Sequence, residues 1–87
     1  MSAIEQIRER LAVLEPLAID IIDDSALHAG HAGARSGGGH FRITIVSAQF
    51  SGKAVMARHR LVYHALGSLM QREIHALSIT ARTPQEH

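Results

Sequence analysis

The sequence contains no cysteine, no tryptophan and only three residues of the Phe, Tyr and Trp type among 87. Without cysteine the chain has no disulfide framework, no thiolate nucleophile and no thiolate metal ligand of its own. It also lacks a run of about 18 apolar residues, so no segment is expected to cross a membrane as a helix. The first residues have neither the basic nor the apolar region of a secretory signal. These absences favour a small cytoplasmic protein.

Charge is distributed unevenly along the chain. Residues 1–24 hold six acidic and two basic side chains, whereas residues 25–87 hold seven basic and two acidic ones. The later part is therefore suited to an anionic partner, although uneven charge on a solvated surface is the simpler interpretation. Seven histidines are also present, and each is a potential metal ligand or proton-binding group.

Two segments have apolar residues at helical spacing. The first begins at a Ser-x-x-Glu capping box at Ser2 and ends before Pro16, whose ring cannot continue the helical hydrogen bonds. The second covers residues 55–71. Residues 84–87 are too few for a further helix and are expected to fray.

Alternating apolar and polar residues predict three strands, over residues 17–23, 40–46 and 75–82. The first two are joined by the glycine-rich loop 26–39 and are expected to pair antiparallel. The strand–helix–strand unit that follows favours a parallel crossover. The sequence therefore predicts one α+β domain over residues 1–87, with the order α-β-β-α-β and a three-stranded mixed sheet that carries its helices on one face.

One face of the second helix is apolar apart from a histidine. Val55, His59, Val62, Leu66 and Leu69 follow one another at spacings of four and three residues, so they are expected to pack on the sheet. A histidine in such a stripe is more often a structural group than a metal ligand. The flanking arginines are expected on more exposed faces.

A basic surface on this helix is a candidate for nucleic-acid binding, because cationic side chains can follow a phosphate backbone. Few aromatic side chains are available to stack on bases. The one Gly-x-x-Gly string, at residues 30–33, lies in the wrong loop for a KH-type backbone clamp. The candidate contact residues are Lys53, Arg58, Arg60 and Arg72.

His75 lies at the junction between the second helix and the third strand, where it is either a solvated residue or a metal ligand. His28, His31 and His40 could join it in a zinc site, although structural zinc usually recruits cysteine. Catalytic signatures are lacking: there is no Gly-x-Ser-x-Gly and no complete phosphate-binding loop. Asp23 and Asp24 are neighbours in a strand and point to opposite faces, so they are expected to close the strand end rather than form a catalytic pair.

Several spaced motifs between Ile7 and Pro84 resemble the BolA family. The pattern is Phe-x-Gly, then Arg-His-Arg-Leu-Val-Tyr, then His-Ala-Leu at position 75 and Thr-Pro at position 83. The residues that carry the signature are Phe50, Gly52, Arg58, His59, Arg60 and Tyr63. This resemblance implies the fold predicted above, akin to a class II KH domain.

The resemblance also implies a function, that of an adaptor without enzymatic activity in iron–sulfur trafficking or iron homeostasis. His75 matches the histidine that helps to ligate a [2Fe–2S] cluster shared with a monothiol glutaredoxin, and His31 matches the second, loop ligand, with His28 as the alternative. The glutaredoxin cysteine and glutathione would supply the remaining ligands. Alone, the chain is expected to be a monomer without cofactor. The alternative that the family suggests is a DNA-binding transcriptional regulator that uses the basic helix surface.

Overall fold

The computed structural model describes residues 2–25 and 39–86. Its elements, in chain order, are α1 (Ala3–Leu11), the 3-10 turn η1 (Ala12–Leu14), β1 (Ala18–Asp23), β2 (Gly39–Val46), the 3-10 turn η4 (Ala48–Phe50), α2 (Val55–Leu66), the single turn α3 (Leu69–Arg72) and β3 (Ile74–Arg82).

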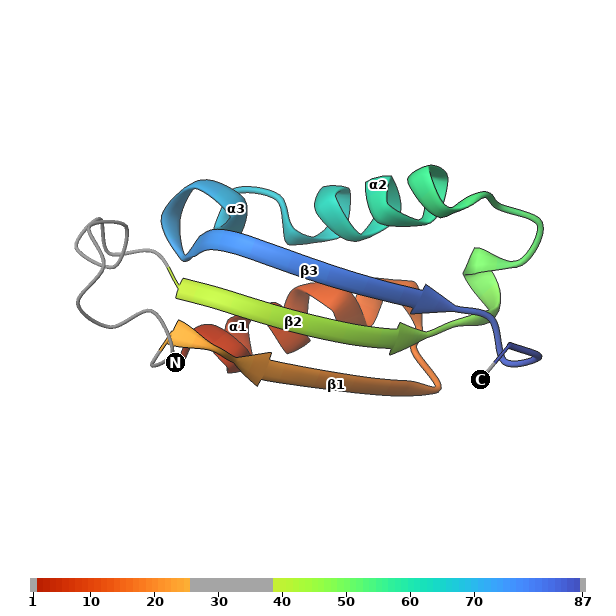
Figure 1. Ribbon diagram of the computed structural model, residues 1–87, viewed down its shortest axis with the longest axis horizontal. Coiled ribbons are helices and arrows are strands. Elements are labelled where there is room, and N and C mark those ends of the chain that lie inside the picture. Colours follow the sequence, from red (N-terminus) through yellow and green to blue (C-terminus); the bar gives the residue numbers. More distant parts are fainter. Residues whose placement is uncertain (1, 26–38, 87) are drawn as a thin grey trace.

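The three strands form one sheet in the order β1-β2-β3 (Figure 1). β1 pairs with β2 antiparallel, and β2 pairs with β3 parallel. In Figure 1, α1 passes behind the strands and α2 runs alongside β3; no helix within the described residues covers the other face of the sheet. The predicted α+β class, the α-β-β-α-β order, the mixed sheet and the placement of the helices on one face are all confirmed.

The capping box at the start of α1 forms as predicted. The Glu5 backbone N–H donates to Ser2 Oγ at 3.1 Å, and the Ser2 backbone N–H donates to Glu5 Oε1 at 3.0 Å. A cap of this kind contributes about 1 kcal/mol. The chain leaves η1 through Glu15, which has a φ of 50°, and turns into β1 after Pro16.

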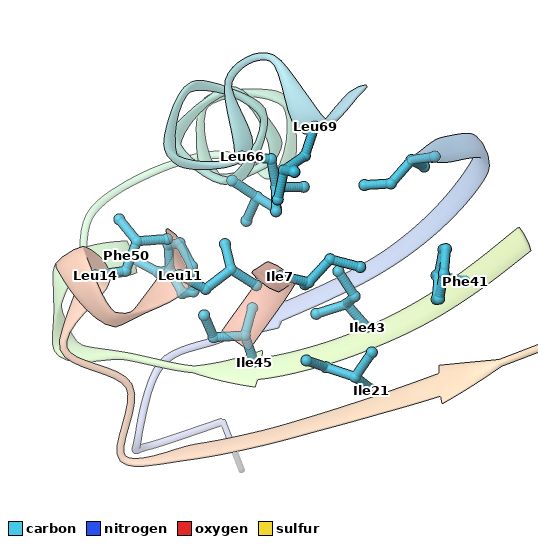
Figure 2. Packing of buried hydrophobic residues seen from close by; sticks show 12 residues of the cluster. Ile7, Leu11, Leu14, Ile21, Phe41, Ile43, Ile45, Phe50, Leu66 and Leu69 are labelled. Atoms are coloured by element: carbon cyan, nitrogen blue, oxygen red, sulfur yellow. The ribbon is translucent and has the colours of Figure 1, made fainter. Parts of the chain in front are cut away.

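The core lies between the sheet and the helices (Figure 2). On β2 the alternating residues Phe41, Ile43 and Ile45 are buried and face α1 and α2, as the sequence predicts. Ile7 of α1 is fully buried between the layers. Burial of each such side chain contributes about 1.5–3 kcal/mol. The other buried members of the cluster are Leu11, Leu14, Ile21, Phe50, Val62, Leu66, Leu69 and Ile74.

The predicted continuous helix over residues 55–71 is wrong, because the chain breaks at Gly67. This residue has a φ of 55°, which no residue of a right-handed helix adopts. Its N–H donates to the Tyr63 carbonyl at 3.0 Å and so ends α2. Arg10 of α1 then donates from Nη1 to the Leu66 carbonyl at 3.3 Å, which satisfies a carbonyl left open by the helix end.

The apolar stripe on α2 begins later than predicted. Val55 is 63% exposed, and His59 is only half-buried. Val62, Leu66 and Leu69 are fully buried. The first turn of α2 therefore lies outside the core, and the packing of the helix on the sheet depends on its second half and on α3.

The end of the described chain forms a hydrogen-bonded turn and no further helix, as the sequence predicts, and the expected fraying of residues 84–87 stays a prediction. The Thr83 N–H donates to Glu86 Oε1 at 2.9 Å, and the Glu86 N–H donates to the Thr83 carbonyl at 3.0 Å. Thr83 itself is buried. These bonds close a turn over residues 84–86; residue 87 lies outside the described residues.

Candidate metal centre

The ladder between β2 and β3 contains a bulge at its start. Gly39 pairs with Ile74, but the next residue, His40, pairs with Ala76, so His75 is an extra residue on β3. A bulge of this kind changes the direction of the side chains around it. Ile74 and Leu77 both face the core although they are three residues apart, and His75 and Ala76 between them are both exposed.

The bulge brings two imidazoles together. His40 precedes the buried Phe41 on β2, so its side chain lies on the open face of the sheet. The ring centroids of His40 and His75 are 5.1 Å apart, and the ring planes make an angle of 43°. His75 is exposed and His40 half-buried. The structure thus pairs the predicted ligand His75 with a histidine of β2.

The other two predicted ligands, His31 and His28, lie outside the described residues, so their role stays a prediction. The sequence had identified His40 only as a member of a possible zinc site. Its position next to His75 depends on the ladder register and on the bulge, neither of which is visible in the local sequence. Alternation along β2 was the available signal, because it places His40 on the face opposite the core.

Hydrogen bonds of its backbone N–H and C=O groups fix the position of His40. The His40 N–H donates to Ser25 Oγ at 3.1 Å, and the His40 carbonyl accepts from the Asp24 N–H at 2.7 Å. Ser25 is fixed in turn, because its N–H donates to Asp23 Oδ1 at 2.8 Å. The hydrogen bond from Ser25 lowers the pKa of the Asp23 carboxyl.

Asp24 forms an ion pair with Arg42, with an Oδ2–Nε distance of 2.6 Å. Asp23 and Asp24 therefore close the strand end, as the sequence predicts.

Gly39 is required immediately before His40. A Cβ atom at this position would lie 2.4 Å from Phe41 Cε2 and 3.2 Å from Ser25 Oγ. The Gly39 N–H also donates to the Glu73 carbonyl at 2.9 Å, which joins the start of β2 to the segment before β3. Any larger residue here would disturb the strand start that carries His40.

The two imidazoles could supply two of the ligands of a metal ion. A metal–nitrogen bond to histidine is about 2.0–2.1 Å, so two imidazoles on one ion have ring centroids about 5 Å apart; the observed separation fits. Within residues 2–25 and 39–86, no group of three or more His, Cys, Asp or Glu side chains could hold a metal. The described chain thus offers two neighbouring imidazoles, of which His40 has its Nε2 atom buried, and further ligands must come from elsewhere.

Arg58 is not the exposed cation that the sequence predicts. Its side chain is 12% exposed, and its Nη1 and Nη2 atoms lie 2.6 and 3.0 Å from the Glu86 carboxylate oxygens. Nε donates to the Lys53 carbonyl at 2.7 Å, and Nη1 also donates to the Ala81 carbonyl at 3.1 Å. The guanidinium is therefore occupied by interactions within the protein.

This network changes the ionisation of both partners. Hydrogen bonds from Arg58, followed by the one from the Thr83 N–H, lower the pKa of Glu86 to about 2, and the bond to Glu86 raises the pKa of Arg58. Arg58 thus belongs to the scaffold, where it joins α2 to the segments before it and after β3.

The other basic candidates are exposed. Lys53 precedes α2, Arg60 lies on its outer face, and Arg72 ends α3, where its Nη2 donates to Ser68 Oγ at 3.4 Å. Tyr63 is 40% exposed. Neither α2 nor α3 contains an acidic residue, although Glu73 follows Arg72 directly at the end of α3.

Two further signature residues have structural positions. Phe50 is completely buried in the core, and Gly52 has a φ of 76° in the turn before α2. No helix in the described parts of the chain is long and apolar enough to span a bilayer.

Comparison with known proteins decides the family. The profile of the family described as BolA-like protein matches residues 11–86. The chain belongs to the BolA family. Protein BOLA1, chloroplastic, of Arabidopsis thaliana is 45% identical to this BolA-like chain over 85 residues, which cover 93% of the chain and 53% of that protein.

Two other relatives support the same assignment. DNA-binding transcriptional regulator BolA of Escherichia coli (strain K12) is 34% identical over 83 residues, covering 94% of this chain and 76% of that protein. The solved structure of BolA1 from Arabidopsis thaliana matches this BolA-like fold with a TM-score of 0.84 and 39% identity, over 100% of this chain and 98% of the other. The chain spans only about half the length of the curated plant protein.

Proposed function

We propose that this BolA-family protein is a cytoplasmic, non-enzymatic adaptor that shares a [2Fe–2S] cluster with a monothiol glutaredoxin and glutathione, in iron–sulfur trafficking or iron homeostasis. The observation that carries the proposal is the pair of imidazoles on the open sheet face, with ring centroids 5.1 Å apart. The chain has no thiolate of its own, so a cluster needs thiolate ligands from a partner.

The residues of the pair suit one iron of such a cluster. Neutral imidazole replaces thiolate on one iron of Rieske-type [2Fe–2S] centres, and this raises the reduction potential of the group. His75, exposed on its bulge, is the ligand that a partner can approach directly. His40 is held by backbone bonds on both sides, so it orients its imidazole beside His75.

The second nitrogen ligand is therefore either His40 or, as the sequence predicts, His31 or His28. Substituting each histidine in turn distinguishes these assignments, because His40 belongs to β2 whereas His31 and His28 lie in the loop before it. An imidazole must be unprotonated to bind a metal. Acidification should accordingly release the cluster whichever histidine takes the second position.

The test is anaerobic reconstitution with a monothiol glutaredoxin, glutathione, iron and sulfide, followed by visible absorption and circular dichroism. Wild type is compared with His75→Ala, His40→Ala, His31→Ala and His28→Ala. A heterodimer spectrum that changes with His75 and with one other histidine supports the proposal and identifies the second ligand. If every spectrum equals that of the glutaredoxin alone, the proposal is abandoned.

A second function, DNA binding, has its own support. Lys53, Arg60 and Arg72 are exposed on or next to α2 and α3, which contain no acidic residue, and the Escherichia coli relative is named as a DNA-binding transcriptional regulator. Arg58 is excluded from this surface because its guanidinium is bound to Glu86. Phosphate contacts must weaken as salt increases. Binding to duplex DNA that is absent at low salt, or insensitive to salt, would remove this candidate.

A further inference from the structure

The outer edge of β3 has a defined set of backbone groups. Successive residues of a strand direct their N–H and C=O groups to opposite sides. The Arg82 carbonyl accepts from the Ser47 N–H on the β2 side, whereas Arg58 reaches the Ala81 carbonyl from outside the sheet. The backbone groups of Leu77 and Ile79, which share the alternation of Ala81, therefore point away from β2.

These groups are open over a short stretch. Within the part of the chain that the structure describes, no loop, helix or side chain bonds the N–H or C=O of Leu77 or Ile79. The stretch begins at the bulge at His75. It ends at Ala81, whose carbonyl accepts a hydrogen bond from Arg58. The open edge thus comprises the two residues Leu77 and Ile79, with four backbone groups.

The two edges of the sheet differ in charge. Natural edge strands avoid pairing with other chains by means of charged residues, proline or bulges. The β1 edge carries Asp20 and Asp23, with Asp24 next to them. From residue 76 to residue 81, β3 has no charged residue and no proline. Only the β1 edge is therefore protected by charge.

Apolar surface accompanies the open edge. The side chains of Leu77, Ile79 and Ala81 are partly buried at the rim of the core. α1 contacts β1, α2 contacts β3, and the two helices contact each other. Three strands span about 14 Å at their usual spacing, whereas two adjacent helices span about 20 Å. A fourth strand beside β3 would thus lie under α2 and continue the core.

A second copy of this chain does not fit the position. In a two-fold symmetric dimer, the usual form of a homodimer, β3 would pair antiparallel with β3, and both α2 helices would lie on the same side of the shared sheet. Because each α2 already covers its own β3 edge, helices about 10 Å in diameter would overlap. The occupant must be an extended segment with no helix of its own over that face.

We propose that the β3 edge between His75 and Ala81 is a strand-addition site for an extended, uncharged segment of a partner protein with apolar side chains at every second position. The segment forms backbone hydrogen bonds with Leu77 and Ile79 and places its apolar side chains under α2. This binding mode uses main-chain bonds for affinity and alternate side chains for selectivity. It does not require the metal centre and is independent of it.

Backbone NMR of the full chain tests the site. In the free protein, the amides of Leu77 and Ile79 should exchange with D2O much faster than those of Ser78 and Thr80, which face β2. The probe is a capped synthetic peptide of alternating threonine and valine with a lysine at each end. At millimolar peptide, exchange at Leu77 and Ile79 should slow several-fold, with shift changes confined to β3 and α2.

Matched variants make the test selective. Leu77→Lys places a charge on the proposed edge and should abolish the response to the peptide. Ile19→Lys makes the same kind of change at a partly buried position of the β1 edge and should leave the response intact. Circular dichroism confirms that both variants fold. The proposal is overturned if shifts map to β1, if no amide slows, or if Leu77 and Ile79 exchange as slowly as Ser78 without peptide.

Discussion

The guanidinium of Arg58 and the carboxylate of Glu86 form a two-point ion pair, with Nη1–Oε1 and Nη2–Oε2 distances of 2.6 and 3.0 Å. The same guanidinium donates to the carbonyls of Lys53 and Ala81. One side chain in the first turn of α2 therefore holds three separate segments together. The arginine that looked from the sequence like a contact for phosphate has its hydrogen-bonding groups directed inward.

Replacing Arg58 should destabilise the fold. Arg58→Ala removes the ion pair and leaves the Lys53 and Ala81 carbonyls without this donor. We expect the midpoint of thermal unfolding to fall by several degrees. Arg60→Ala, on an exposed neighbouring position of the same helix, should change the free energy of unfolding by no more than about 0.5 kcal/mol. Equal midpoints for the two variants, measured by circular dichroism, would contradict this scaffold role.

Glu86 should make stability depend on acid. Its pKa in the folded protein is about 2, below the ordinary 4.5, so it contributes stability above pH 4.5 that is lost as pH falls from 4.5 towards 2. Urea unfolding over this range should show a decline that is smaller in Glu86→Gln. Because the Glu86 side chain is 47% exposed to solvent, added salt should reduce the effect. Adding Arg58→Ala to Glu86→Gln should change the pH profile no further; a separate, additive change would count against the pair.

The break at Gly67 should resist substitution. Gly67→Ala forces a side chain into a φ of 55° and places its Cβ 3.1 Å from Arg10 Nη1. Gly67 combines this φ with a ψ of −129°, a sparsely populated region that costs a residue with a side chain about 1–3 kcal/mol. Gly52→Ala is the matched control, since it has a φ of 76° but no atom within 4 Å. Chemical denaturation should show a greater loss for Gly67→Ala, and the reverse order would contradict the role of Arg10.

The buried hydroxyl of Ser47, at the opposite end of the sheet from the imidazoles, should contribute to the stability of the fold. Ser47 is fully buried, donates from Oγ to the Leu14 carbonyl at 2.6 Å and accepts from the Gln49 N–H at 3.1 Å. Ser47→Ala leaves these groups without a partner, at a cost of about 1–3 kcal/mol. Ser78→Ala, on the exposed sheet face, should be close to neutral. Urea denaturation of both variants checks the difference.

Local patterns predicted the elements of this fold well. Alternation identified the buried face of β2, and the Ser-x-x-Glu string identified the start of α1. The break at Gly67 was indicated by the glycine itself, yet the helical spacing on either side of it favoured a continuous helix. Val55 was misplaced because spacing shows which side of a helix is apolar but not how far the core extends along it.

The candidate metal centre was predictable only in part. His75 was identified by family resemblance. Its contact with His40 depends on a ladder between strands that are more than 30 residues apart in the sequence, and on one extra residue in that ladder. Long-range pairing of this kind leaves no local pattern. The ion pair of Arg58 with Glu86 was missed for the same reason, because it joins residues 28 positions apart.

Because of the extra residue in β3, the strand can pack its apolar side chains in the core and still carry His75 outside the core. From Leu77 onward, side chains alternate as the core requires, and Ile74 keeps its place in the core before the bulge. The position between them that carries His75 is released from that alternation and makes no contribution to the buried cluster. Its chemistry can accordingly be exchanged, imidazole for thiol or carboxylate, with little effect on folding. The scaffold thus offers a position whose side-chain donor atom can be redesigned independently of stability.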